Sequence, residues 1–388
     1  MIDLGIEKLL GGCRSLVQGK RFAFVTHEAA CVRDGESSLK KIITAFPGQL
    51  QSVWSPQHGY YGVEQANMIP SADFRDPQSG IPVKSLYGER RRPSPEMFDD
   101  IDLVLVDLVD VGCRVYTYLW TLVLVMQAAA EAGVPVLVLD RPNPLGGERV
   151  EGNLLRRENA SFVGLYPLPM RHGLTLGELS RYLNDVYDLG CRLEVVPMDG
   201  WRRDMYLDET GVFLVPPSPN MPTLNTALVY PGQVLLEGTN LSEGRGTTSP
   251  FELWGAPFVE PERLLAEIDR RLTDGLFLRP TFFSPTFDKW SGQVCGGLQL
   301  HVVDRQRFRP YLVSLEILRA VLKLYGDRFS WLSPPYEYEY EKLPFDILTG
   351  DERLRLALEN GEDILALLES WLPELEDFHR RRREFLLY

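Results

Sequence analysis

The chain has 388 residues, of which 44% are hydrophobic and 11% aromatic, and its formal net charge is −13. This length favours about two domains, and the composition is sufficient for substantial buried cores. The negative charge argues against nucleic acid or an anionic membrane as a partner. The five cysteines are scattered and never spaced as C-x-x-C, which favours a reducing compartment. Because the N-terminus lacks the basic and apolar regions of a leader and no apolar run is long enough to cross a bilayer, we expect a cytoplasmic location.

The first 150 residues alternate short apolar runs with amphipathic segments. The pattern predicts strands at Arg21–Thr26, Leu50–Trp54, Pro82–Leu86, Leu103–Leu108 and Val134–Asp140. Between the last two, Tyr118–Ala132 contains neither Gly nor Pro and is followed by Gly133, as in a helix with a glycine C-cap. Strands that alternate with helices in this way predict an α/β fold with an open, mostly parallel sheet.

Polar and aromatic side chains follow each predicted strand. Ligands of such sheets bind beyond the carboxyl ends of the strands, so these side chains are candidates for a site. They include His27, Gln57, His58, Glu64, Asn67, Glu89, Arg114, Tyr116, Tyr118, Asp140, Arg141 and Asn143. Carboxylates, amides and aromatic faces together suit a sugar, although polar residues are also common at the ends of strands for structural reasons.

Several cofactor classes lack their sequence signatures. No G-x-G-x-x-G follows the first predicted strand, and there is no P-loop, no H-E-x-x-H and no G-x-S-x-G. The five histidines have no metal-ligand spacing. We therefore expect neither a nucleotide cofactor nor a metal.

Residues 151–388 mix helices and strands less regularly. A capping box at Thr175–Glu178 predicts a helix to about Asn184. Further strands are predicted at Leu193–Val196, Leu276–Phe283 and Gly297–Val303. Further helices are predicted at Pro261–Leu272, Arg309–Tyr325, Asp351–Glu359, Ile364–Leu368 and Glu374–Leu387. Tyr336–Glu341 alternates aromatic and acidic residues and could be an edge strand or a loop. We expect a smaller second domain that packs tightly on residues 1–150, with the site in the cleft between them.

The stretch Ser218–Thr247 is the richest in groups useful for chemistry. Its residues 237–247 hold two carboxylates, Glu237 and Glu243, and one guanidinium, Arg245, among three glycines. The amides and hydroxyls of the same stretch are Asn220, Thr239, Asn240, Ser242 and Thr247. The pattern favours a loop that binds a polyhydroxylated ligand, and a surface turn held by a Glu–Arg pair is the simpler alternative.

The order of motifs resembles one family over essentially the whole chain. Eight segments carry the resemblance: residues 55–59, 85–88, 110–118, 140–144, 218–222, 237–247, 295–301 and 345–350. They are similar to the bacterial exo-β-N-acetylmuramidase family, long catalogued as a domain of unknown function. The resemblance implies a Rossmann-like domain in residues 1–150, a smaller α+β domain in 151–388, and a site in the cleft. It also implies release of N-acetylmuramic acid from the non-reducing ends of peptidoglycan fragments, without a metal or a nucleotide.

One position departs from the family. Its characterised enzymes have a glutamate before the His-Gly pair, whereas this chain has Gln57, and an amide cannot donate a proton as a carboxylic acid does. Glycoside hydrolysis needs a carboxylic acid and a second group that supplies or stabilises the nucleophile. The candidates are Glu64, Glu89, Glu237 and Glu243, and we predict that Glu64 acts with a carboxylate of the central stretch. Alternatively, the 2-acetamido group of the substrate attacks and Gln57 holds it.

Further side chains are assigned to substrate binding. The lactyl carboxylate of muramic acid would be bound by an arginine, because the planar guanidinium makes two parallel hydrogen bonds to a carboxylate. The candidates for this role are Arg114, Arg141, Arg171 and Arg245, with Tyr116 and Tyr118 as stacking partners of the sugar. Other expected contacts are Asp140, Asn143, His172, Asn220, Thr239 and Asn240, whereas His58 is assigned with Gln57 to the catalytic group. Two alternatives stay open: a non-catalytic protein that binds or senses an amino sugar, and a hydrolase of a different glycoside.

Overall fold

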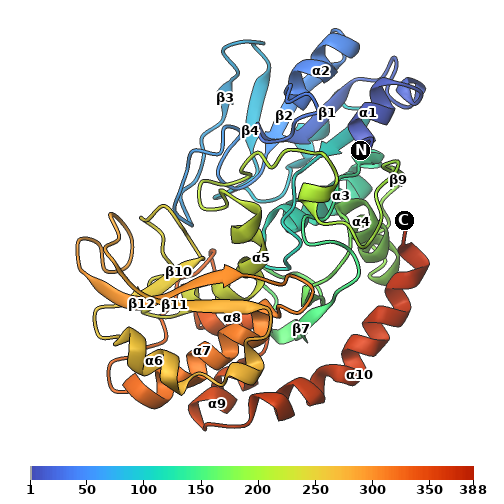
Figure 1. Cartoon of the computed structure of the whole chain (residues 1–388). Coiled ribbons are helices and arrows are strands. Elements are labelled where there is room, and N and C mark those ends of the chain that lie inside the picture. The colour runs from blue at the N-terminus through green and yellow to red at the C-terminus, as the bar shows by residue number, and fades with distance from the viewer. Residues whose placement is uncertain (1) are drawn as a thin grey trace.

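The computed structural model describes residues 2–388. Two structural units lie at opposite ends of the molecule, one around a large sheet and the other around a small one (Figure 1). Within the described residues, no helix has the length and apolar character needed to cross a membrane.

The large sheet has seven strands in the order β3-β4-β2-β1-β5-β6-β9. In chain order they are β1 (Phe22–Thr26), β2 (Leu50–Ser55), β3 (Phe74–Arg75), β4 (Pro82–Ser85), β5 (Leu103–Asp107), β6 (Val136–Leu139) and β9 (Leu193–Val196). All neighbouring pairs are parallel except β3 with β4. The predicted mixed α/β class with a mostly parallel sheet is confirmed.

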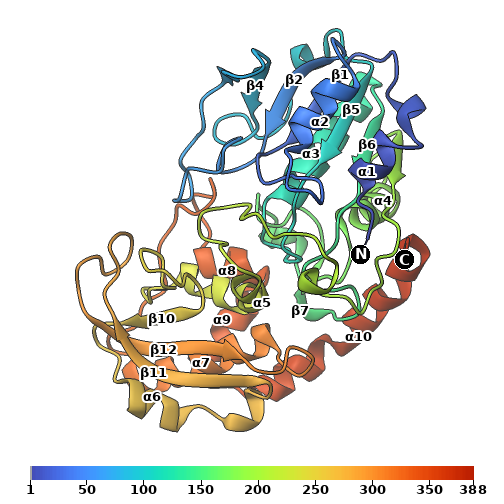
Figure 2. The same ribbon diagram turned by 45° about the horizontal axis from the view of Figure 1, so that its top comes forward.

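Helices cover both faces of this sheet (Figure 2). Phe22 and Phe24 of β1 pack in one apolar cluster with α1 (Gly5–Leu10) and α2 (Ser38–Ala45). Ala23 and Val25 point to the other face and pack with α3 (Tyr118–Ala132) and α4 (Leu176–Val186). Burial on both faces is the physical reason why the central strands read as nearly continuous apolar runs.

The sheet extends beyond the predicted domain boundary. All five strands predicted in residues 1–150 are present, but β9 pairs in parallel with β6 and belongs to the same sheet. A boundary at residue 150 therefore lies inside the first unit. The reason is that the segment after β6 returns through α4 and adds one more parallel strand, as a β-α-β crossover does.

The second unit begins with α5 (Leu224–Gln233), which continues as a 3-10 helix at Val234–Gly238. Its sheet is antiparallel in the order β10-β12-β11. The strands are β10 (Leu253–Ala256), β11 (Leu276–Phe283) and β12 (Cys295–Val302). The helices are α6 (Pro261–Glu267), α7 (Pro310–Tyr325), α8 (Pro344–Thr349), α9 (Glu352–Glu359) and α10 (Ile364–Arg382). A two-stranded ribbon, β7 (Glu151–Leu154) with β8 (Pro169–Arg171), leads from the first unit toward it.

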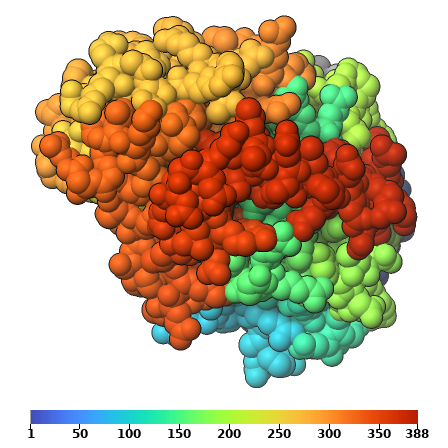
Figure 3. Space-filling model, turned by 90° about the horizontal axis from the view of Figure 1, so that it is seen from below, coloured from blue at the N-terminus to red at the C-terminus, as the bar shows by residue number. Residues whose placement is uncertain are grey.

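The last helix differs from the prediction of two helices. It runs without interruption from Ile364 to Arg382 with Pro373 inside it. Proline removes one intrahelical hydrogen bond, that to the carbonyl four residues earlier. Glu369 and Pro373 are both exposed, so water can satisfy that carbonyl. The helix lies across the second unit and reaches the first (Figure 3).

The end of the chain is bonded to the end of β6. The buried Asp140 carboxylate accepts hydrogen bonds from the Thr175 hydroxyl at 2.7 Å and from the Gly177 N–H at 2.8 Å, at the N-terminus of α4. It accepts a third from the Tyr388 hydroxyl at 2.7 Å, and that hydroxyl accepts one from the Met198 N–H at 2.8 Å. Asp140 therefore has a structural role at this point, and it does not line the cavity described below.

We expect Tyr388→Phe to lower the free energy of unfolding by about 1.5–3 kcal/mol, because it removes a hydrogen bond to a buried carboxylate. Urea unfolding followed by circular dichroism measures the difference. Tyr340→Phe is the matched control, since that side chain is 65% exposed, and it should change stability by less than about 0.5 kcal/mol. Equal stability of the two variants would contradict the structural role of the terminal hydroxyl.

Candidate active site

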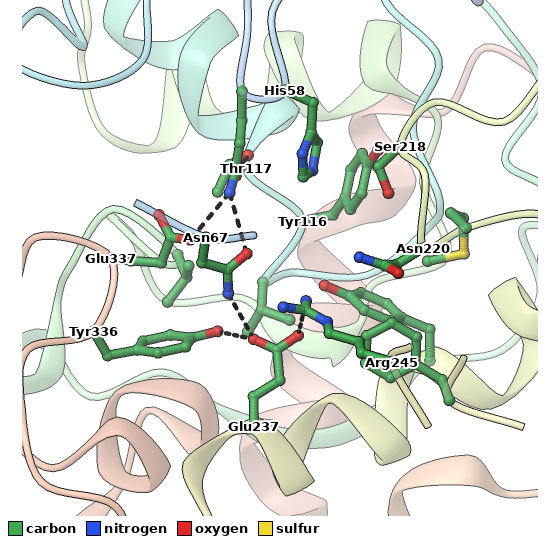
Figure 4. A pocket seen from close by; sticks show the side chains of 16 residues that line it. His58, Asn67, Tyr116, Thr117, Ser218, Asn220, Glu237, Arg245, Tyr336 and Glu337 are labelled. Carbon is green, nitrogen blue, oxygen red and sulfur yellow. Dashed lines mark hydrogen bonds and ion pairs between the residues drawn. The ribbon is translucent and has the colours of Figure 1, made fainter. Parts of the chain in front are cut away.

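A cavity of about 420 Å³ lies where the two units meet. Loops after β2 and before α3 line it from the first unit, and residues beyond α5 line it from the second (Figure 4). The polar residues of its wall are Gln57, His58, Asn67, Tyr116, Thr117, Ser218, Asn220, Tyr230, Glu237, Arg245, Tyr336 and Glu337. Val115, Val163, Met221 and Phe251 complete the lining.

Glu337 lies on a tight turn at one wall of the cavity. Glu337 and Tyr338 both have left-handed backbone conformations, with φ of 46° and 64°. Non-glycine residues rarely adopt this conformation, and strain of this kind is concentrated at functional sites. The turn buries the Glu337 side chain to 2% exposure.

Two donors from the first unit hold the Glu337 carboxyl group. One oxygen lies 3.0 Å from the Gln57 side-chain nitrogen, and the other lies 2.8 Å from the Tyr87 hydroxyl. Burial raises the pKa of Glu337 to about 7, and the nearby Glu237 adds to the rise, while the bonds from Tyr87 and Gln57 oppose it. A carboxyl group with this pKa is protonated in a large fraction of molecules at neutral pH.

Gln57 has its amide orientation fixed. Its oxygen accepts a hydrogen bond from the Thr117 hydroxyl at 2.5 Å, so its nitrogen faces Tyr87 and Glu337. The Tyr87 hydroxyl accepts from Gln57 and from the Met68 N–H and donates to Glu337. Gln57 is therefore a hydrogen-bond donor to the Glu337 carboxyl group.

Glu237 forms the opposite wall together with Arg245. One carboxylate oxygen is 2.7 Å from the guanidinium of Arg245. The other accepts hydrogen bonds from the Asn67 amide at 2.9 Å and the Tyr336 hydroxyl at 2.6 Å. Glu237 is thus a fixed, ion-paired carboxylate, in contrast to Glu337, which has no cation among its hydrogen-bond partners.

Glu243 supports this wall from behind. It lies 2.8 Å from the ammonium group of Lys289 and 3.4 Å from Arg245, and it does not line the cavity. Burial alone would raise the pKa of Glu243, but Lys289 and Arg245 hold it below its ordinary value. Arg245 is accordingly held in position by two carboxylates.

His58 presents one ring nitrogen to the cavity. Its Nδ1 lies 2.6 Å from the carbonyl oxygen of Glu64, which can only accept, so Nδ1 carries the proton. Burial lowers the pKa of His58 to about 4, and the ring is therefore neutral at pH 7. Nε2 is left as an acceptor for an N–H or O–H group of a ligand.

Both halves of the chain match models of a single family. Residues 22–225 match the N-terminal model described as exo-beta-N-acetylmuramidase NamZ, and residues 228–388 match the corresponding C-terminal model. The chain belongs to the NamZ family. The peptidoglycan beta-N-acetylmuramidase NamZ of Bacillus subtilis is 39% identical over 387 residues, which cover 100% of this chain and 91% of that protein. The predicted family and the predicted glycosidase class are confirmed by these matches.

Solved structures of the family catalogued as DUF1343 share the fold. A protein from Bacteroides fragilis superimposes with a TM-score of 0.89 at 32% identity, covering 100% of this chain and 99% of its own. A second protein from the same organism gives a TM-score of 0.77 at 26% identity, with the same coverage. The two NamZ family models meet between residues 225 and 228, which agrees with the placement of β9 in the first unit.

The cavity brings together six of the residues predicted from the sequence for this NamZ family member. They are Gln57, His58, Tyr116, Asn220, Glu237 and Arg245, and Asn67, named among the polar residues after the second predicted strand, joins them. Glu64 does not line the cavity and contacts His58 only through its backbone carbonyl. Glu89 is exposed and lies in a neighbouring groove.

Other predicted residues support the cavity from behind without lining it. The Tyr118 hydroxyl donates to the carbonyls of Gln57 and Pro217. Thr239 bonds to the backbone of its own turn, and the Asn240 side chain bonds to the backbone of Arg328 and Ser330. These interactions fix loops of the wall and leave no free group toward a ligand in the cavity.

Three of the four arginines that were candidates for binding the lactyl carboxylate are bonded to other groups of the protein. Arg114 donates to four backbone carbonyls, and Arg141 makes a two-pronged ion pair with Asp107. Arg171 donates to the Leu145 carbonyl. Arg245 is the one of the four candidates that lines the cavity.

Asn143 and His172 are also buried away from the cavity. Asn143 bonds to the backbone of Leu145 and Leu174 within a turn. The ring of His172 accepts from the Leu174 N–H, and its other nitrogen is 3.9 Å from Asp110. Both residues shape the loops after β5 and β6.

Glu337 and Tyr336, which also line the cavity, were not predicted as site residues. Tyr336–Glu341 is a turn, as the loop alternative allowed, and its acidic residues have different environments. Glu337 is buried, whereas Glu341 is exposed. The alternation of aromatic and acidic residues was the available signal, but it does not show which carboxylate points inward.

Proposed function

We propose that this protein is an exo-β-N-acetylmuramidase that releases N-acetylmuramic acid from the non-reducing ends of peptidoglycan fragments. Its membership of the NamZ family and its similarity to the Bacillus subtilis enzyme support this proposal. The observation that carries it is the pair of carboxyl groups in one cavity: Glu337, with a pKa of about 7, and Glu237, ion-paired with Arg245. Two carboxyl groups whose environments differ in this way are the usual acid and charge-stabilising group of a glycosidase.

Glu337 is the proposed general acid. Its proton passes to the glycosidic oxygen as the bond to the anomeric carbon breaks, and a carboxylate is left behind. The Gln57 amide and the Tyr87 hydroxyl already point at its two oxygens and stabilise that carboxylate. In this assignment Glu337 is the acid, which is the role that the sequence suggested for Glu64. Gln57 affects the reaction by donating a hydrogen bond to the Glu337 carboxyl group.

Glu237 is the proposed stabiliser of positive charge at the anomeric carbon. Its two oxygens are held by Arg245, Asn67 and Tyr336, so the carboxylate does not need to reorganise when charge develops. This arrangement is compatible with attack on the anomeric carbon by either water or the substrate's own acetamide.

The remaining wall suits the substituents of an amino sugar. The free Nε2 of His58 can accept from an amide N–H or a hydroxyl, and Asn220 and Tyr116 line the same space. Arg245 is the proposed partner of the lactyl carboxylate, because its guanidinium lines the cavity. Within residues 2–388, no cluster of three or more His, Cys, Asp or Glu side chains is placed to hold a metal ion.

The test compares two chromogenic substrates with the purified protein, a β-N-acetylmuramide and the β-N-acetylglucosaminide that lacks the lactyl group. We expect turnover of the muramide and at least about tenfold lower kcat/KM for the glucosaminide, because a buried polar site discriminates against an analogue that lacks its partner. Absence of cleavage of both would contradict the proposal. Saturable binding of the muramide without turnover would instead favour the sugar-binding alternative.

A further inference from the structure

A second, more open groove shares Glu337 with the cavity. Its volume is about 1500 Å³. The walls come from the loop after β4, from the segment that precedes β8, and from the turn that carries the acid. Charged and aromatic side chains along it include Glu89, Arg90, Arg91, Arg92, Phe162 and Tyr338.

Three consecutive arginines line this groove, and their partners differ. Arg90 pairs with Asp73 at 2.5 Å, and Arg92 pairs with Glu131 at 2.5 Å. For Arg91, no carboxylate among residues 2–388 lies within ion-pairing distance. Its guanidinium instead lies 4.9 Å from the centre of the Tyr338 ring and 5.5 Å from that of Phe162. The two rings hold a positive group in the groove without neutralising it.

Because a general acid protonates the oxygen of the bond that breaks, the leaving group must lie beside Glu337. The oxygen that receives the proton joins the released sugar to the next sugar of the fragment, so both sugars must approach the same carboxyl group. The smaller cavity takes one of them. The open groove, which shares Glu337 as a wall, offers the other an aromatic surface and an unpaired cation.

We propose that this groove is the leaving-group subsite, and that Arg91 binds a carboxylate of the peptidoglycan fragment beyond the scissile bond. This inference rests on the proposed function. The carboxylate has two possible sources, the lactyl group of the next muramic acid or the peptide attached to it. Guanidinium–carboxylate pairing is the shared chemistry.

The experiment compares Arg91→Gln with the wild type on four substrates: the nitrophenyl β-N-acetylmuramide, the disaccharide N-acetylmuramic acid–N-acetylglucosamine, the same disaccharide extended by one muramic acid without peptide, and that trisaccharide with its peptide. We expect unchanged kcat/KM on the first two and about a tenfold loss on at least one extended substrate, mainly through KM. The peptide is joined through an amide of the lactyl carboxyl group, so the last substrate carries only the carboxylates of its peptide. Loss only on the peptide-free trisaccharide identifies the lactyl carboxylate, loss only on the last identifies the peptide, and loss on both shows that Arg91 binds either carboxylate.

Arg92→Gln is the matched control, because it removes one charge from the same groove where Glu131 already neutralises it. It should change kcat/KM on all four substrates by less than about twofold. An Arg91→Gln variant that cleaves every substrate like the wild type overturns the subsite and leaves the proposed function intact. A wild-type protein that cleaves none of the four overturns the proposed function itself.

Discussion

Replacing Glu337 by glutamine is expected to lower kcat on the disaccharide by about 10²- to 10⁴-fold, because this is the usual contribution of a positioned general acid. The substitution keeps the size of the side chain, so KM should change by only a few-fold. Steady-state kinetics on the purified variant measures both constants. Glu341→Gln is the matched control, since that carboxylate belongs to the same turn but is exposed, and it should retain full activity.

Two further readouts distinguish an acid from a merely structural residue. With a pKa of about 7, Glu337 loses its proton as the pH rises through 7, so wild-type kcat/KM should fall above that pH. The falling limb should be absent from the residual activity of Glu337→Gln. A nitrophenyl leaving group needs less protonation, so the loss should be smaller on that substrate. Full activity of the variant, or an unchanged falling limb, would remove Glu337 from the mechanism.

Replacing Arg114 by methionine is expected to lower the free energy of unfolding by about 3–5 kcal/mol. The guanidinium is fully buried and donates to the carbonyls of Asn153, Leu168, Leu348 and Thr349 at 2.8–3.1 Å. These carbonyls belong to the β7–β8 ribbon and to the end of α8, so one side chain joins segments of both units. Truncation leaves several buried acceptors without a donor, and each costs about 1–3 kcal/mol.

Denaturant unfolding of Arg114→Met and of the wild type measures this difference. Arg263→Met is the control, because Arg263 is exposed on α6 and its ion pair with Glu260 is exposed as well, and it should cost less than about 1 kcal/mol. A loss below about 1 kcal/mol for Arg114→Met would show that water or a rearranged side chain satisfies the four carbonyls. Arg114 would then again be a candidate for substrate binding.

The fold was predictable where burial dictates the pattern. The strands of the large sheet are covered on both faces, so their apolar runs stand out, and the helix at Tyr118–Ala132 was found with its bounds. The number of strands in that sheet was not predictable from the pattern alone. The spacing of Leu193–Val196 indicates a strand, but pairing with β6 depends on a helix packing across the sheet.

Residues whose neighbours in sequence already form a polar cluster, such as Gln57, His58 and Arg245, line the cavity as expected from the sequence. Arg114 and Asp140 do not line it, because a polar residue after a strand can bond to backbone and helix ends as readily as to a ligand. Glu337 was missed because its partners, Gln57 and Tyr87, are 280 and 250 residues away in the chain. Its unusual pKa arises from that enclosure, which no local pattern contains.

The acid and the groups that govern its proton belong to different units of the molecule. Glu337 comes from the second unit, while Gln57 and Tyr87 come from the first. If the units separated, water would surround the carboxyl group and its pKa would return toward 4.5, the value of a free glutamate. At neutral pH the side chain would then be an ordinary anion with no proton to give. If Glu337 is the acid as proposed, catalytic competence depends on the docking of the two units, and an opened molecule would be inactive even with every side chain chemically intact.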